Sequence, residues 1–137
     1  MKRSEFLQPL SREHHAALSL ARFCERAAQS GDPARVREAC EHVAADLSGE
    51  IERHFQDEER DVLPLLQGTE KTQPLVERTL EDHRRLRSLL GDLQRNDIEA
   101  LGSFGGWLLA HVRFEERVLF PAIEAFLPPC SGGPSGQ

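Results

Sequence analysis

The sequence predicts an all-α fold, an antiparallel four-helix bundle with up-down-up-down topology. Proline and glycine divide the chain into four long segments. Within these segments apolar residues recur at intervals of three and four, which is the period of a helix and not of a strand. The connections between segments are short, and short connections favour antiparallel neighbours.

The first two helices meet at a clear boundary. The first is expected over residues 9–30, and Gly31-Asp32-Pro33 follows it. Asp32 is a good N-cap, and Pro33 suits the first helical position. The second helix is therefore expected over residues 33–66.

The third and fourth helices are bounded by similar signals. Pro74 opens the third, expected over residues 74–95, in which Leu75, Val76, Leu86 and Leu90 belong to one apolar stripe. Residues 96–99 resemble a capping box for the fourth helix, expected to reach residue 126. The fourth helix contains three glycines, which lower helix propensity and so indicate close approach to a neighbour: Gly102, Gly105 and Gly106.

Composition narrows the class of protein. The chain has 137 residues, 39% of them hydrophobic, and a formal net charge of −6. We expect one domain over residues 1–129 and a disordered tail over residues 130–137. Acidic residues outnumber basic ones and the two signs alternate, so neither nucleic acid nor a membrane is expected as a partner. Three unclustered cysteines and the lack of a signal peptide predict a reduced, cytoplasmic setting.

A charged phrase occurs twice in the chain. Residues 54–64 read HFQDEERDVLP and residues 111–121 read HVRFEERVLFP. Positions four apart lie on one helix face, so His54 pairs with Glu58 and His111 with Glu115. Each pair falls within an apolar stripe that should face the core.

Buried carboxylates need a proton, a cation or a metal. His83 lies on the inward stripe of the third helix, and the first helix carries adjacent histidines. His14 shares a face with more apolar residues than His15, so His14 is the favoured candidate and His15 the alternative. Imidazole with carboxylate suits iron, zinc or manganese, and facing helices of a bundle commonly build such sites.

This constellation resembles the hemerythrin-like (HHE cation-binding) domain family over about residues 10–127. The resemblance implies a metal set of His14, His54, Glu58, His83, His111 and Glu115. It implies a non-haem di-iron centre, with two irons bridged by both carboxylates and an oxo or hydroxo group. It further implies a protein that binds or senses O2, NO or another small diatomic ligand. It does not indicate which protein, if any, is a partner. Weak oxidase or peroxidase activity is conceivable, but an enzyme is not the favoured interpretation.

The sequence also departs from the oxygen-carrying members of that family. They have a second histidine on the third helix, where this chain has Thr79. They place an aspartate five residues after the fourth-helix histidine, an offset held here by Glu116, whereas the internal repeat favours Glu115 as ligand. These departures favour a second hypothesis, iron handling or repair of iron centres. A third hypothesis is a metal-free interaction bundle, against which the expected burial of Glu58 and Glu115 argues.

The remaining polar and aromatic residues have supporting roles. The resemblance implies that Trp107 and Leu108 line a ligand pocket, with plain core as the alternative for Trp107. Glu59 and Glu116 either pair with arginine, orient a ligand histidine, or are solvated. Pro64 and Pro121 should bend or end their helices just past the site. His42 should be on the surface, and Cys24 and Cys40 should be buried.

Overall fold

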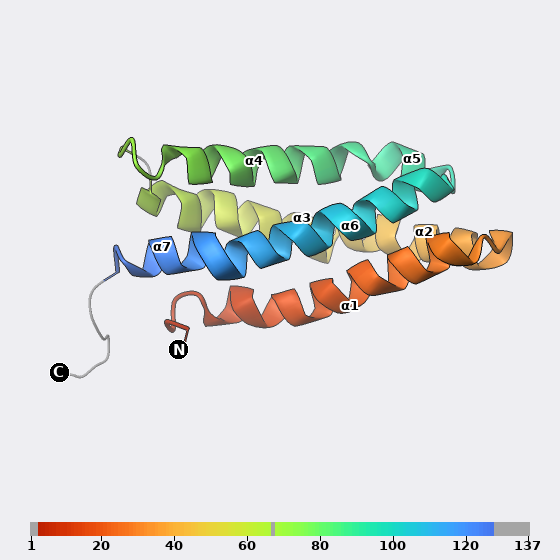
Figure 1. Ribbon diagram of the computed structural model, residues 1–137, viewed down its shortest axis with the longest axis horizontal. Helices are drawn as coiled ribbons and strands as arrows, with labels where there is room; N and C mark the ends of the chain where they lie inside the picture. Colours follow the sequence, from red (N-terminus) through yellow and green to blue (C-terminus); the bar gives the residue numbers. More distant parts are fainter. Residues whose placement is uncertain (1–2, 67, 128–137) are drawn as a thin grey trace.

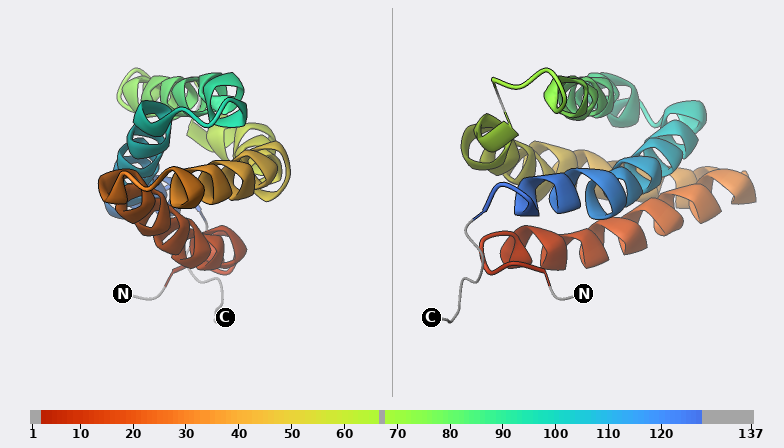
Figure 2. Two further views of the ribbon diagram at one scale, coloured as in Figure 1. Left: turned by 90° about the vertical axis from the view of Figure 1, so that its right-hand side faces the viewer. Right: turned by 60° about the vertical axis from the view of Figure 1, so that its left-hand side comes forward.

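The computed structural model describes residues 3–66 and 68–127, which are helical with no strand among them. The predicted tail over residues 130–137, with Cys130, lies outside the described part of the chain. Four long segments run side by side and alternate in direction (Figure 1). An end-on view shows them grouped around a common axis (Figure 2). The predicted all-α four-helix bundle is confirmed.

The segments differ in how continuous they are. The first is a single helix, α1 (Gln8–Ser30). The others are subdivided. The second consists of α2 (Pro33–Ser48), α3 (Glu50–Asp57), a π-helical turn η1 (Glu58–Val62) and a 3-10 turn η2 (Leu63–Leu66). The third consists of α4 (Gln73–Ser88) and α5 (Leu90–Gln94), and the fourth of α6 (Ile98–Phe114), a π-helical turn η3 (Glu115–Leu119) and α7 (Phe120–Glu124).

Two predicted helix boundaries rest on aspartate caps. The Asp32 carboxylate accepts a hydrogen bond from the Ala34 N–H at 3.2 Å, as predicted. At the fourth segment the cap is Asp97, which accepts from the N–H groups of Glu99 and Ala100. The N-cap thus lies one residue later than predicted, and the predicted capping box does not form because the third helical residue is Ala100, which has no side-chain acceptor. Asn96 instead has a φ of 62°, the left-handed conformation that ends the preceding segment.

The repeated phrase folds twice into the same irregular structure. Each α-helix widens into a π turn that begins at the inward glutamate, Glu58 or Glu115. Pro64 and Pro121 follow these turns, and a proline ring cannot accommodate the carbonyl four residues earlier in a regular α-helix. The predicted effect of the prolines is confirmed, and the distortion places a π turn at both candidate ligands, as is frequent at functional sites.

The α1–α6 contact is close because of one glycine. A Cβ atom at Gly105 would lie 2.7 Å from the Ala21 carbonyl oxygen and 2.8 Å from Glu25 Cγ. At Gly102 and Gly106 the nearest atoms would be 3.6 and 3.8 Å away, which are ordinary contacts. Of the three glycines, only Gly105 is required for close approach.

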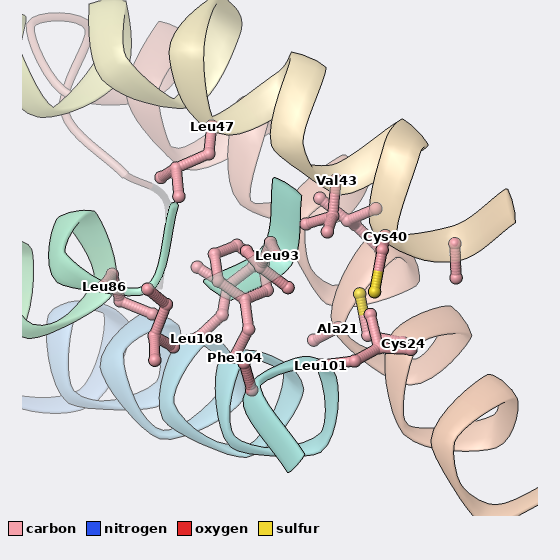
Figure 3. Packing of buried hydrophobic residues seen from close by; sticks show 14 of the residues in the cluster. Ala21, Cys24, Cys40, Val43, Leu47, Leu86, Leu93, Leu101, Phe104 and Leu108 are labelled. Atoms are coloured by element: carbon pink, nitrogen blue, oxygen red, sulfur yellow. The ribbon is translucent and has the colours of Figure 1, made fainter. Parts of the chain in front are cut away.

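Two hydrophobic clusters occupy the interior. The larger includes Cys24, Cys40 and Phe104, with the two thiols facing each other from α1 and α2 (Figure 3). The smaller includes Leu10, Val62, Val76, Leu119 and Phe120. Along each segment, buried polar residues lie between the parts that contribute to the two clusters. The core is thus divided by a polar layer.

No helix within the described residues is long and apolar enough to cross a membrane.

Candidate metal centre

The polar layer brings together the six residues predicted as metal ligands. One set of possible ligand atoms comes from His14, His54, Glu58 and Glu115; the other comes from Glu58, His83, His111 and Glu115. In each set the four atoms lie within 4.8 Å of one another. Both sets combine two imidazoles with the same two carboxylates. Two cation positions of equal donor composition therefore lie side by side.

Each shared carboxylate directs one oxygen toward each set. Glu58 Oε2 lies 3.0 Å from His54 Nε2, and Glu58 Oε1 lies 3.0 Å from His83 Nε2. Glu115 Oε1 lies 2.6 Å from His14 Nε2, and Glu115 Oε2 lies 3.1 Å from His111 Nε2. Both glutamate side chains are fully buried. This placement is what two bridging carboxylates would require.

Two atoms of the centre lack a hydrogen-bond partner in the described structure. They are His111 Nε2 and Glu115 Oε2, which approach to 3.1 Å but not at the angle of a hydrogen bond. Leaving buried polar atoms unsatisfied costs about 1–3 kcal/mol each. A cation between them would satisfy both, so the donor set fits a metal centre.

A second layer of acids holds the outer nitrogen of every candidate histidine. The Nδ1 atoms lie within hydrogen-bond distance of these acids: His54 of Glu13 at 2.5 Å, His83 of Glu59 at 2.7 Å, His111 of Asp82 at 2.9 Å, and His14 of Glu116 at 2.6 Å. In a neutral imidazole an Nδ1–H that donates to an acid leaves the Nε2 lone pair directed inward. All four rings are therefore oriented for binding through Nε2.

These acid–histidine contacts form a closed ring around the bundle. Each segment contributes one acid and one histidine, and each acid reaches the histidine of the next segment. The first segment reaches the second through Glu13, the second the third through Glu59, the third the fourth through Asp82, and the fourth the first through Glu116. The ring links all four segments at the level of the candidate centre.

An arginine binds each outer acid on its solvent side. The pairs are Arg53–Glu13 at 2.6 Å, Arg87–Glu59 at 2.8 Å, Arg78–Asp82 at 3.2 Å and Arg3–Glu116 at 3.1 Å. Charge therefore alternates from the surface inward: arginine, acid, histidine, shared carboxylate. The predicted supporting role of Glu59 and Glu116 combines both alternatives, because each acid contacts an arginine and a histidine.

The carboxylates control protonation of the metal-free centre. Burial lowers the pKa of His54, but Glu115 and Glu58 outweigh it and raise the pKa to about 11. Burial likewise opposes protonation of His111, yet Glu115 and Asp82 raise its pKa to about 10. Burial alone would raise the pKa of Glu115, but His111 and the other facing imidazoles hold it well below its usual value. Without a metal, protons on the imidazoles balance the buried carboxylates.

Residues 6–123 of the chain match the family model of the hemerythrin HHE cation binding domain. The chain belongs to this family. Comparison with curated proteins and with solved structures gave no significant match. Membership in the HHE family identifies the centre as a cation-binding site, and the His/Glu cluster supplies suitable donor atoms.

The structure distinguishes between the alternative candidates for the metal ligands. His14 is buried and touches Glu115, whereas His15 is exposed. Glu115 is buried among the histidines, and Glu116 lies outside them. His42 is on the surface, as predicted, with a side chain 58% exposed. The assignment of these groups as ligands stays a prediction, but their positions agree with it.

Thr79 stands at the third-helix position where the sequence resemblance implied a further histidine in oxygen-carrying members. It is fully buried, and its hydroxyl donates to the Leu75 carbonyl at 2.8 Å. This bond lies within α4, so the hydroxyl needs no hydrogen-bond partner in the metal centre. With Thr79 excluded, the histidines divide evenly, two to each set.

A cleft of about 300 Å³ reaches the centre between α1, α3 and α6. Leu108 lines it, as do His14, His54 and Glu115, but neither Glu58 nor His83 does. The structure does not bring Trp107 to this cleft. Adjacent helical residues point about 100° apart, and the Trp107 ring is partly exposed beneath Arg85, whose guanidinium lies 5.4 Å from the ring centre.

Sequence reasoning missed Glu13 and Asp82. Each directly precedes a candidate ligand, in the dipeptides Glu13-His14 and Asp82-His83. That adjacency was a usable signal for an outer acid. It did not indicate that each acid would hold a histidine of a different helix.

Proposed function

We propose that the chain binds two iron ions and uses them to bind or sense a small diatomic ligand such as O2 or NO. One iron would be held by His14 and His54, the other by His83 and His111, with Glu58 and Glu115 shared. The observation that carries the proposal is the presence of two four-donor sets that share both carboxylates. Mixed imidazole and carboxylate donors suit iron, and also zinc or manganese.

The protein's own contribution is orientation, charge and access. The outer acids keep each Nε2 directed inward, and two shared carboxylates offset two units of a bound cation's charge. Bound iron would supply a coordination position and electrons for the gas. The cleft lets a small molecule approach the His14–His54 side, whereas His83 does not line the cleft and has no exposed surface.

Metal content and absorption test this proposal. Purified protein should contain about two irons per chain and show near-ultraviolet absorption of an oxo-bridged ferric pair, lost on reduction. His54→Ala and Glu58→Ala should remove this absorption because each deletes a donor. His42→Ala is the matched control, since His42 is exposed and outside both sets. Protein that isolates with zinc or manganese alone, or unchanged spectra in both variants, would refute the di-iron proposal.

Iron handling is the second candidate, and the cleft favours it. The cleft borders both histidines of the His14–His54 position but only His111 of the other set, so one ion could exchange with solvent more readily than the other. A chelator challenge should then remove one iron quickly and the second slowly. Loss of both at one rate would count against iron donation and leave gas binding as the function.

A metal-free bundle is disfavoured by the buried charges. Without a metal, Glu58 and Glu115 share a fully buried layer, and carboxylates in such a setting require compensating protons. If metal-free and as-isolated protein melt at the same temperature, the interaction-bundle hypothesis gains and the metal proposal fails.

A further inference from the structure

The cleft beside the candidate centre is larger than a diatomic ligand requires. Its volume is about 300 Å³. An apolar cavity of about 150 Å³ suffices to bind benzene, and small-molecule sites begin at roughly 300 Å³. O2 or NO would leave most of this space to water.

The walls of the cleft are apolar and its floor is polar. The walls are Ala16, Ala17, Leu20, Ile51, Phe55, Leu108 and Val112. The floor includes His111 and Glu115, which also belong to the candidate metal centre. These side chains are 2% and 0% exposed. A molecule with an apolar body and one polar end matches this division.

The charged residues at the mouth of the cleft determine whether a charged molecule can enter. Glu13, Asp46, Glu50 and Arg53 line it, and three carboxylates against one guanidinium leave a net charge of −2. Arg53 is already paired with Glu13 and Glu50, so it offers little attraction to an anion. An organic anion would meet repulsion at the entrance.

We infer that the cleft binds an uncharged organic molecule of about single-ring size, such as a phenol or an alcohol. Its apolar body lies against the α1, α3 and α6 walls, and its polar end faces His111 and Glu115. This inference deepens the proposed function, because the polar end would also face the metals. The walls, floor and mouth belong to the chain itself and do not depend on which metal is bound.

Fluorine NMR of the full-length, metal-free protein tests the inference without relying on activity, because a bound zinc ion would itself attract the carboxylate of a probe. The probes are 4-fluorophenol, which is neutral at pH 7, and 4-fluorobenzoate, a ring of similar size with a negative charge. 4-Fluorophenol should bind saturably with one site per chain. 4-Fluorobenzoate should bind about tenfold more weakly or not at all, and replacing both Asp46→Asn and Glu50→Gln should narrow the difference.

Variants that fill the cleft locate the site. Ala17→Leu and Ile51→Phe, on opposite walls, should each weaken 4-fluorophenol binding about tenfold or more, because the added atoms occupy the ring's volume. Ala34→Leu, an exposed position of α2 away from the cleft, should leave binding unchanged. Circular dichroism and melting temperature establish that each variant is folded. Two filling variants are used so that the test still stands if one of them does not fold.

The outcomes separate this inference from the proposed function. Absence of saturable 4-fluorophenol binding, binding unaffected by both filling variants, or equal affinity for 4-fluorobenzoate would overturn the inference. Iron content and spectra decide the proposed function independently. Probe binding by a protein that takes up no iron would refute only the di-iron proposal, whereas two irons without probe binding would refute only this inference.

Discussion

Asp82 and His111 meet across two helices, with Asp82 Oδ2 2.9 Å from His111 Nδ1. Asp82 directly precedes His83, a member of the same donor set, so one short piece of α4 contributes one candidate ligand and holds another in place. The Asp82 side chain is 15% exposed and also binds Arg78. It is the most enclosed of the four outer acids.

Asp82→Asn should weaken metal binding. Loss of the charge removes the partner that orients the His111 ring and raises its basicity, and such outer partners are worth about 10- to 100-fold in metal affinity. Competition with a chelator of known affinity measures the change. Asp92→Asn is the matched control, because Asp92 pairs only with Arg95 at the surface among the described contacts. Equal affinity in Asp82→Asn and wild-type protein would show that the outer contact does not tune the centre.

Gly105→Ala should destabilise the bundle. The new Cβ would lie 2.7 Å from the Ala21 carbonyl oxygen, so α1 and α6 must separate, at a cost of about 1–3 kcal/mol. Gly102→Ala provides the contrast, because its Cβ would meet only Ala28 Cβ at 3.6 Å. There the gain in helix propensity should dominate, up to about 1 kcal/mol in favour of folding. Chemical unfolding of both variants checks the opposite signs, and equal effects would contradict the close-approach argument.

Metal uptake should release protons at neutral pH. In the metal-free protein the pKa of His54 is about 11 and that of His111 about 10, so both are protonated at pH 7.5. A metal requires the neutral imidazole. Affinity should therefore rise with pH until about pH 11, where both imidazoles are neutral. An indicator dye in weak buffer measures the protons released by zinc, and release of none would contradict the raised pKa values.

The same shifts predict how the metal-free protein responds to alkali. A pKa raised above the ordinary value of about 6.5 stabilises the folded state below that value, and the contribution is lost as pH rises through the folded-state pKa. The free energy of unfolding of the metal-free protein should thus fall in a broad step that begins near pH 6.5 and is complete near pH 11. The metal-loaded protein should lack this step, because its imidazoles are already deprotonated. Denaturant titrations across this range distinguish the two forms.

Neither core thiol should react in the folded protein. Burial raises the pKa of Cys24 to about 12 and also raises that of Cys40, so the reactive thiolate is scarce. In a Cys130→Ser variant, a thiol reagent at pH 8 should find no reactive group until denaturant is added and then two. Rapid reaction of either thiol without denaturant would show that the α1–α2 contact opens readily.

The helical segments were predictable from the sequence, because helix period, caps and prolines act locally. The sequence also showed which side chains face inward: the stripes that contain His54, His83 and His111 were recognisable without coordinates. The doubled phrase indicated both shared glutamates for the same reason, since a spacing of four is a property of one helix. Pro64 and Pro121 also indicated where the second and fourth segments would be distorted.

The pairing of these groups could not be predicted, because it depends on how the helices pack. Which oxygen of Glu58 faces which histidine, and that Glu13 holds His54 while Glu116 holds His14, depend on the relative placement of different helices. The same placement excluded Trp107 from the cleft and put Glu13 and Asp82 into the ring of contacts. Local periodicity specifies the face of a side chain. Its partner across the bundle depends on helix packing, which cannot be read from residue spacing within one segment.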